Sequence, residues 1–307
     1  MKIIIYISFI IFCWINSAKA QYFPVFSHYV INGLVINPAY TGSREVMSIN
    51  ILYRNQMIGI NGAPVYQTLS IHAPLKNPKL GLGFLFFNEN TGPLHTTHAF
   101  ATYAYKVQLG AGKLNFGLQT GIIYGEYNWN TMYLNDPGDQ AFNSNNNTYV
   151  LPNIGAGLYY YSRSFFAGLA VPYFLSYKET GARDAYSIYH DLNNYNFLFS
   201  AGYLFRVSKD FKLKPSTLVK YYINSSEQID LNLIAILLDD KLWIGGSYRF
   251  QEAVAALFEL QINPQFRISY TFEYAGNNTG YFNYTSHEIG LRYEFSYKLK
   301  AFNPRYF

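Results

Sequence analysis

The chain has 307 residues, of which 50% are hydrophobic, 19% aromatic and only 13% charged, with a formal net charge of +5. Few charges and many tyrosines favour a surface that is apolar over most of its area and polar at its rims. The composition excludes intrinsic disorder. No apolar run reaches the ~20 residues of a membrane-spanning helix, and no cluster of Lys and Arg indicates nucleic-acid binding.

Residues 1–20 predict a secretory signal peptide. Lys2 gives a positive start, an apolar stretch runs from Ile3 to Ile15, and Ala18-Lys19-Ala20 fits the small-x-small cleavage rule. The stretch is too short to span a bilayer, and a signal fits it better than a buried N-terminal helix. The only cysteine, Cys13, lies within it, so the exported chain would begin at Gln21 and would have to be stable without disulfides.

Residues 21–45 form an N-terminal segment that is too apolar for a free tail in the periplasm. Its apolar residues are Tyr22, Phe23, Phe26, Tyr29, Ile31, Leu34, Val35 and Ile36. The segment is expected either to enter the domain that follows as a plug or to dock on a periplasmic partner.

Residues 46–307 alternate between apolar and polar side chains with a period of two, and no long amphipathic helix interrupts the series. In one segment, for example, Leu114, Phe116 and Leu118 oppose Asn115 and Gln119. The pattern predicts fourteen strands, at about 47–54, 65–73, 79–87, 96–109, 113–127, 149–161, 165–175, 195–207, 211–223, 227–238, 241–250, 253–261, 265–274 and 286–299.

The connections between these strands predict an antiparallel barrel in the outer membrane. Every second connection is short, and the intervening ones include all the long loops, at about 55–64, 88–95, 128–148, 176–194 and 275–285. An even number of strands with short turns on one side and long loops on the other is the pattern of bacterial outer-membrane barrels. We expect the loops at 128–148 and 176–194, rich in Asn, Asp, Tyr and Ser, to face the exterior and contact a binding partner there.

A soluble β-sandwich is the alternative fold, and the polar faces of the strands argue against it. A sandwich shows one face of each strand to water, whereas these faces carry mostly Gly, Ser, Thr, Asn and Gln. Glu126, an acidic residue on an apolar face, fits a position at the membrane rim. Pro152, Pro172 and Pro215 stand inside predicted strands and require a bulge, a strand boundary or a miscounted segment.

The barrel interior should hold charges of both signs. We expect these charges to form a salt-bridged network that fills the lumen, although a conducting pore could be lined in the same way. A fourteen-stranded barrel is too wide for its wall side chains to fill, which favours the plug for residues 21–45. The inward charged residues are Arg54, Lys106, Arg206, Lys220, Asp230, Arg249, Glu259, Arg267, Glu273, Glu288, Arg292 and Glu294.

A series of short motifs near the N-terminus resembles the PorP/SprF family of outer-membrane proteins of the type IX secretion system. The motif residues occur in family order, and singly each motif is weak. Lys79-Leu80-Gly81-Leu82-Gly83 and Gly92-Pro93 follow them, and Met57 stands where the family would have an aromatic residue. The motif residues are Asn37, Pro38, Ala39, Tyr40, Gly42, Tyr53, Arg54, Asn55, Gln56, Gly62, Ala63, Pro64, His72 and Pro74.

The resemblance implies a partner-binding barrel rather than an enzyme, with no catalytic residue and no cofactor. Family members act in the export or anchoring of large surface proteins with C-terminal sorting domains, including gliding adhesins. They are thought to connect this cargo to periplasmic ring lipoproteins or peptidoglycan-linked components. A second hypothesis is a transporter of small hydrophobic compounds with an N-terminal hatch, which would need an apolar lumen pocket and a lateral opening. An outer-membrane enzyme is the third.

Metal binding was weighed at His95, His98 and His72. Spacing of i, i+3 in a strand sends the two side chains to opposite faces, so His95 and His98 are expected to be ordinary polar residues of a loop and of the lumen.

Overall fold

The computed structural model describes residues 27–128, 147–179, 186–223, 227–276 and 283–295. The predicted signal peptide, the apolar residues Tyr22 to Phe26, most of the loop at 128–148 and the C-terminal end lie outside these ranges. In the described part, no helix is long and apolar enough to cross a membrane.

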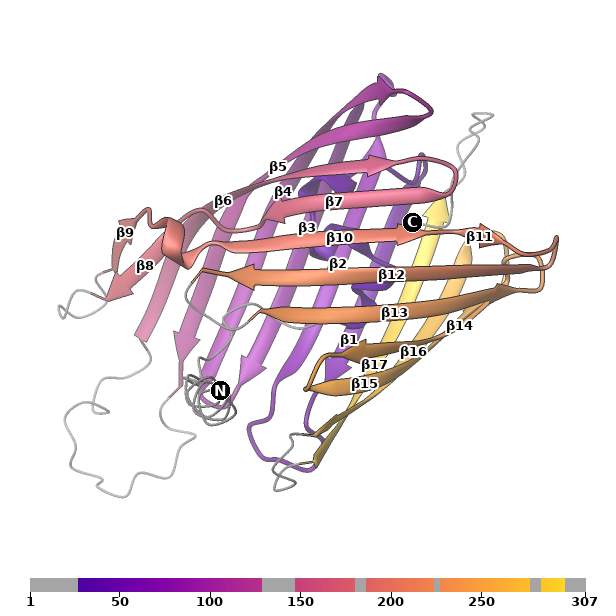
Figure 1. Cartoon of the computed structure of the whole chain (residues 1–307). Coiled ribbons are helices and arrows are strands. Elements are labelled where there is room, and N and C mark those ends of the chain that lie inside the picture. Colours follow the sequence, from indigo (N-terminus) through magenta and orange to yellow (C-terminus); the bar gives the residue numbers. More distant parts are fainter. Residues whose placement is uncertain (1–26, 129–146, 180–185, 224–226, 277–282, 296–307) are drawn as a thin grey trace, which may run out of the picture.

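The protein is a closed antiparallel barrel, as predicted (Figure 1). Each strand pairs with its neighbours in the chain, and β1 pairs with β17 to close the ring. Fourteen wall strands are described: β1 (Met47–Asn55), β2 (Val65–Pro74), β3 (Leu80–Thr91), β4 (Leu94–Leu109), β5 (Gly112–Tyr127), β6 (Asn147–Tyr161), β7 (Phe165–Val171), β10 (Asn196–Tyr203), β12 (Phe211–Tyr222), β13 (Gln228–Leu237), β14 (Leu242–Arg249), β15 (Ala253–Gln261), β16 (Phe266–Gly276) and β17 (Asn283–Phe295).

Smaller elements complete the described chain. β11 (Phe205–Arg206) continues β10 along β12, and β8 (Ser176–Glu179) pairs only with β9 (Tyr186–Tyr189) among the described residues. Four short 3-10 helices are described: η1 (Ser27–Val30), η2 (Gly33–Val35), η3 (Pro38–Tyr40) and η5 (Leu192–Asn194). We call the end of the barrel with the β1–β2, β5–β6 and β16–β17 connections the loop side. The opposite end, with turns such as 110–111 and 162–164, is the turn side.

The two faces of the wall have the chemistry that the alternation predicts. Outward side chains are large, apolar and exposed, such as Leu118 at 60% and Leu231 at 54%, whereas their inward neighbours, such as Asn115 at 0% and Gln119 at 5%, are buried. An apolar outer face on a closed ring of paired strands is the arrangement that a lipid bilayer requires. The barrel is therefore built for the outer membrane.

Three sequence predictions about the wall need correction. The predicted loop at 88–95 is mostly strand, because β3 and β4 continue in register to a tight turn at Gly92, where φ is +54°. The strand predicted to end at 175 ends at Val171, because Pro172 leads the chain out of the ladder. The loop at 176–194 contains the β8–β9 hairpin.

Pro215 lies within β12, opposite Leu233 of β13. On the other side of β12, the ladder is interrupted at Leu204, between the pairs Gly202–Ser216 and Phe205–Leu213. Proline has no N–H to donate, so a break in the neighbouring ladder beside Pro215 is the expected consequence.

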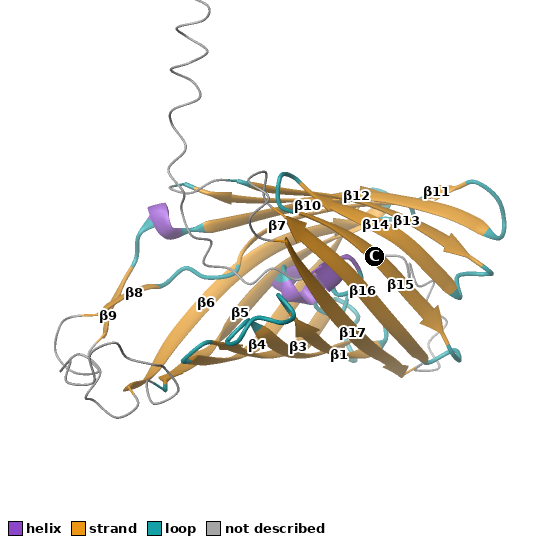
Figure 2. Cartoon of the chain, turned by 90° about the horizontal axis from the view of Figure 1, so that it is seen from below, coloured by secondary structure: helices purple, strands orange, loops and turns teal. Residues whose placement is uncertain are grey.

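The described part of the N-terminal segment, residues 27–45, lies inside the ring of strands. Figure 2 shows its helical turns surrounded by the wall. None of its residues is exposed, and η3 contacts β4, β5, β6 and β7. The interior of the barrel is thus occupied by a part of the chain that precedes the first strand.

Candidate functional site

Glycines of the wall form a seat for η3. A Cβ atom at Gly117 of β5 would lie 2.1 Å from the backbone N of Ala39, and one at Gly157 of β6 would lie 2.2 Å from the side-chain oxygen of Asn37. Real Cβ contacts are never so close, so the backbone of the N-terminal segment reaches the wall only because these positions lack side chains.

The motif Asn37-Pro38-Ala39-Tyr40 is shaped to fill this seat. The side chain of Asn37 accepts a hydrogen bond of 2.9 Å from the N–H of Ala39, which caps η3, and donates one of 2.9 Å to the carbonyl of Leu158. Asn115 donates from β5 to the carbonyl of Ala39 at 2.9 Å. Pro38 stands at the start of η3, where its missing N–H costs nothing. The motif therefore joins a local turn to two wall strands.

Towards the turn side, His72 and Tyr40 hold the next turn of the segment. The ring of Tyr40 packs edge-on against His72, with centroids 5.4 Å apart, and the N–H of Gly42 donates to Nδ1 of His72 at 3.2 Å. Lys106 donates to the carbonyl of Gly42 at 2.7 Å. The predicted motif residues Gly42, in the segment, and His72, in β2, are thus in contact on the inner face of the wall.

Two ion pairs fix the turn-side end of the segment. Arg44 pairs with Glu294 of β17 at 2.5 Å, and both side chains are almost completely buried. Glu45 pairs with Lys113 of β5, whose side chain is 40% exposed. The buried pair is expected to matter more, because solvent weakens the exposed one.

At the loop side, two carboxylates hold the beginning of the segment. Glu288 of β17 accepts hydrogen bonds of 3.0 Å from the backbone N–H groups of Ser27 and His28, and it contacts the His28 ring. Ser27 donates from its hydroxyl to Glu273 of β16 at 2.6 Å. Arg54 of β1, which is 0% exposed, pairs with Glu288 and, at 2.8 Å, with Glu273.

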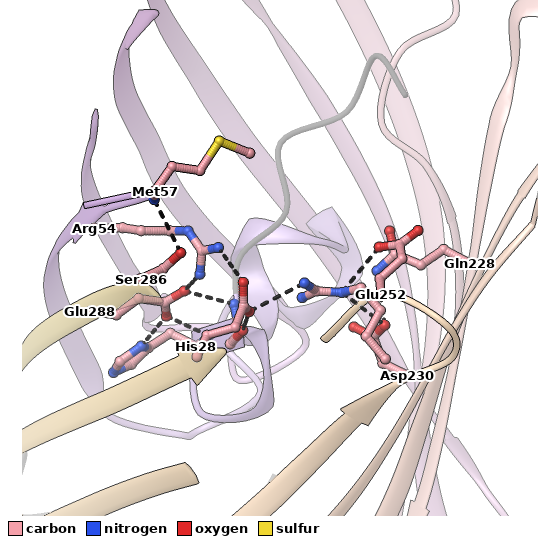
Figure 3. A network of polar contacts seen from close by, with 11 residues as sticks. His28, Arg54, Met57, Gln228, Asp230, Glu252, Ser286 and Glu288 are labelled. Carbon is pink, nitrogen blue, oxygen red and sulfur yellow. Dashed lines mark hydrogen bonds and ion pairs between the residues drawn. The ribbon is translucent and has the colours of Figure 1, made fainter. Parts of the chain in front are cut away.

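This cluster extends around the wall to β13 and β14. Arg249 pairs with Glu273 at 3.2 Å, Asp230 at 3.3 Å and Glu252 at 3.8 Å. Figure 3 shows His28, Arg54 and Glu288 pointing toward one another and the network continuing to Asp230 and Glu252. Each carboxylate of the network is paired with Arg54 or Arg249, so the network serves to hold the beginning of the N-terminal segment against the wall.

The other half of the lumen is apolar at the loop side. Inward side chains of β1 to β6 form a cluster with Val35 of the segment, and His98 stacks on Phe87 with centroids 3.9 Å apart. Tyr173, from the chain after β7, packs against this cluster. The cluster consists of Val35, Leu52, Tyr66, Leu85, Phe87, Phe100, Ile123 and Leu151.

The cavities beside the segment are small. One of about 30 Å³ lies between the segment and β6, β7, β10 and β12, and one of about 20 Å³ lies between it and β1, β15, β16 and β17. Each has room for one or two water molecules. At these two places, the described residues of the segment therefore pack closely against the wall.

The predicted motif residues occupy five separate places. Asn37, Pro38, Ala39, Tyr40, Gly42 and His72 meet at the seat, and Arg54 belongs to the loop-side cluster. Tyr53 points outward and is 44% exposed, toward lipid. Asn55, Gln56, Gly62, Ala63 and Pro64 lie at or beyond the loop-side end of β1, where Gly62 accepts a hydrogen bond from Gly92 at 2.8 Å. Pro74 ends β2 at the turn side.

The salt-bridged network predicted for the lumen is present, with one correction. Arg206 is exposed near a turn and bonds to Ser164 at 2.6 Å, so it does not belong to the buried network. The register with β12 is the same before and after Leu204, so the alternation holds, and Arg206 lies outside the network because it stands at the turn-side end of the strand. The roles of Ser27 and His28 were missed, although an excess of inward carboxylates on β16 and β17 could have indicated that the segment supplies donors to them.

His95 and His98 are separated as expected. His95 bonds to Asn90 at 2.6 Å beyond the apolar cluster, whereas His98 is buried within it. His72 lies at the seat of η3.

Comparison with known proteins gives a family and a fold. Residues 18–293 match the family described as "Type IX secretion system membrane protein PorP/SprF". No curated protein matches the sequence significantly.

Among solved structures, the barrel is similar to the CymD monoaromatic hydrocarbon channel, with a TM-score of 0.57 and 12% identity over 88% of this chain and 94% of that one. It is also similar to the toluene transporter TbuX of Ralstonia pickettii, with a TM-score of 0.53 and 9% identity over 87% and 94%. At such identities the likeness concerns the fold alone.

Proposed function

Because the chain belongs to the PorP/SprF family of type IX secretion system membrane proteins, we propose that it binds a large exported surface protein with a C-terminal sorting domain and helps to export or anchor it. Binding, and not catalysis, is the proposed role. The family match carries this proposal, since it extends over the N-terminal segment and nearly all of the described barrel.

The N-terminal segment is proposed to act as a plug. The glycine seat, the buried Arg44–Glu294 pair and the cluster around Glu288 support this role, because they hold the segment along the lumen from the loop side to the turn side. Deletion of residues 22–36 should raise ion conductance in planar bilayers. Unchanged conductance would contradict the plug.

The two ends of the barrel suit different partners. The loop side carries the long connections and would face the exported protein. In the family's known roles, such exported proteins include adhesins of the gliding machinery. The turn side would face the periplasm, where ring lipoproteins or peptidoglycan-linked components could be reached. Outer-membrane lipid surrounds the apolar outer face.

An affinity purification tests the proposal. The tagged protein is isolated from outer membranes in mild detergent, and proteins that accompany it are identified by mass spectrometry, with an unrelated tagged barrel as the control. Recovery of a large surface protein with a C-terminal sorting domain, or of ring lipoproteins, supports the secretion role. A barrel that is isolated alone contradicts it.

A second candidate function is transport of small hydrophobic compounds. The apolar cluster around Phe87, Phe100 and Leu151 favours it, because such a surface could receive an apolar ligand at the loop side. The close packing of the segment against the wall weighs against it. Binding of toluene by the purified barrel, together with the absence of exported proteins in the affinity purification, would favour the transporter.

A further inference from the structure

Within the described residues, the ladder between β6 and β7 stops short of the loop side. The β6–β7 ladder begins at Tyr161–Phe166 and ends at Ala156–Val171, whereas β6 continues to Asn147 (Figure 1). Within the described residues, β6 is therefore laddered only to β5 over its first nine residues, 147–155. We call the β7-facing backbone of Thr148, Val150 and Pro152 the β6 edge.

The chain after β7 closes only the base of this gap. Pro172 accepts a hydrogen bond of 2.8 Å from the inward side chain of Gln119. Phe174 donates to the carbonyl of Ile154 at 2.9 Å, and the side chain of Asn153 accepts from the N–H of Phe174 at 3.2 Å. The chain then leaves the ladder, and the β8–β9 hairpin meets β6 through Tyr186 against Tyr149, with ring centroids 5.0 Å apart.

The hydrogen-bonding direction of β6 defines which groups face the gap. Ser162 donates to Phe165 and Ile154 accepts from Phe174, both on the β7 side. The register with β5 is unbroken from Tyr161 to Asn147, so every second residue, including Pro152, Val150 and Thr148, presents its backbone to the same side. Pro152 is tolerated in the strand because its missing N–H would have pointed into the gap.

The β6 edge lies near the membrane surface. Val150 and Ile154 point outward and are 59% and 47% exposed. Val150 is paired with Tyr124, and Glu126 lies two residues further toward the loop side, where the wall becomes polar. Strand edges are not left open toward hydrocarbon, because no water is present there to satisfy the backbone. The N–H and C=O groups of Thr148 and Val150 therefore call for a partner that offers alternating acceptors and donors.

We propose that the β6 edge binds an extended strand of the exported surface protein. This strand would pair antiparallel with β6, in the position that β7 would occupy if it continued beyond Val171. The proposal rests on the cargo-binding role proposed above and names the β6 edge as the binding site for the exported protein. An uncharged, apolar strand fits best, because residues 148–155 carry no charge and show Val150 and Ile154 to the outside.

A second copy of the chain fits the edge less well. A two-fold pair of β6 edges centred on Val150 would set Thr148 against Pro152, and proline has no N–H for the ladder. Each copy would then lack one backbone hydrogen bond in a short ladder that has only a few. Lipid offers no alternating donors and acceptors at all. The exported protein also reaches this edge from the loop side, where we place it.

Two substitutions at one residue test the edge. Val150→Pro removes an N–H that faces the gap and leaves the β5–β6 ladder intact, whereas Val150→Ala trims the side chain and keeps the N–H. In affinity purifications, Val150→Pro should lower recovery of the exported protein about tenfold, and Val150→Ala should leave it within about twofold. Equal recovery with both variants would overturn the proposal.

Photo-crosslinking keeps the test valid if Val150→Pro fails to assemble. Benzoylphenylalanine is placed at Thr148, at Val150 and, as a control, at the outward Leu231 of β13. The proposal expects crosslinks from 148 and 150 to one segment of the exported protein, at positions about two residues apart and in reversed order. Crosslinks only to lipid, to a second copy or to the β8–β9 hairpin would refute it.

These outcomes separate the two proposals. If the exported protein accompanies the unaltered barrel but both variants recover it equally, the β6 edge is wrong and the cargo-binding role stands. If no exported protein accompanies the unaltered barrel, the cargo-binding role fails and the edge proposal fails with it.

Discussion

The seat of η3 leads to a specific prediction, because two glycines of the wall differ in the space that a Cβ atom would find. A Cβ atom at Gly117 would meet the N and Cα atoms of Ala39 at 2.1 and 2.3 Å, whereas one at Gly246 of β14 would meet only the carbonyl oxygen of Ala255 at 3.6 Å. The same substitution, Gly→Ala, should therefore have opposite effects at the two positions.

The magnitude follows from the distances. To restore an ordinary contact, Gly117→Ala must push the N-terminal segment away by at least about 1 Å, and overpacking of this kind costs roughly 1–3 kcal/mol. Removing a glycine from a strand offsets about 0.4–1 kcal/mol of this cost through the unfolded chain. Gly117→Ala should be destabilising by about 1–2 kcal/mol, and Gly246→Ala should be neutral or stabilising.

Urea unfolding in detergent and conductance in planar bilayers measure the two consequences. Each 1.4 kcal/mol is a tenfold change in population, so Gly117→Ala should raise the population of a displaced segment by about tenfold and increase conductance. Gly246→Ala should behave as the unaltered protein or better. Equal midpoints and equal conductance for the two variants would refute the role of the wall glycines as a seat.

Three further predictions concern the fastenings of the segment and the orientation of the barrel. Glu288→Gln leaves the buried Arg54 without one of its two carboxylates and should lower the stability to urea by about 3 kcal/mol; an unchanged midpoint would contradict the importance of the loop-side cluster. Arg44→Ala should cost about 3 kcal/mol and Lys113→Ala less than about 1 kcal/mol, because only the Arg44 pair is buried; similar losses would contradict this ranking. Protease treatment of intact cells should cut within 128–148 or 176–194 and spare the turn at 208–210, and cleavage confined to short turns would invert the proposed orientation.

The wall was predictable because lipid enforces a simple rule along each strand. Outward positions must be apolar, so Leu231 and Leu233 stand out against Asp230 and Asn232, and the period of two gives strand number and facing together. The rule fails beyond the membrane. Asn88 to Thr91 are polar on both faces because β3 extends past the lipid, and the sequence there resembles a loop although the ladder continues.

The site was predictable only in part, because its contacts join residues far apart in the chain. The apolar character of the N-terminal segment indicated burial. It could not indicate that Asn37 donates to a carbonyl in β6 or that its side chain occupies the space left by the missing side chain of Gly157. Neither contact produces a periodic pattern in the sequence. Pro172 indicated a boundary for β7, but Pro152 and Pro215 gave the same indication and lie within their strands, so the sequence did not show which proline ends a strand.

The most direct test of the central claim compares the surface proteins of cells with and without this chain. Cells that lack it, and the same cells with the gene restored, are shaved with protease, and the released peptides are quantified by mass spectrometry. The account predicts that a large protein with a C-terminal sorting domain disappears from the surface and returns with the restored gene. An unchanged set of surface proteins would contradict a role in secretion or anchoring.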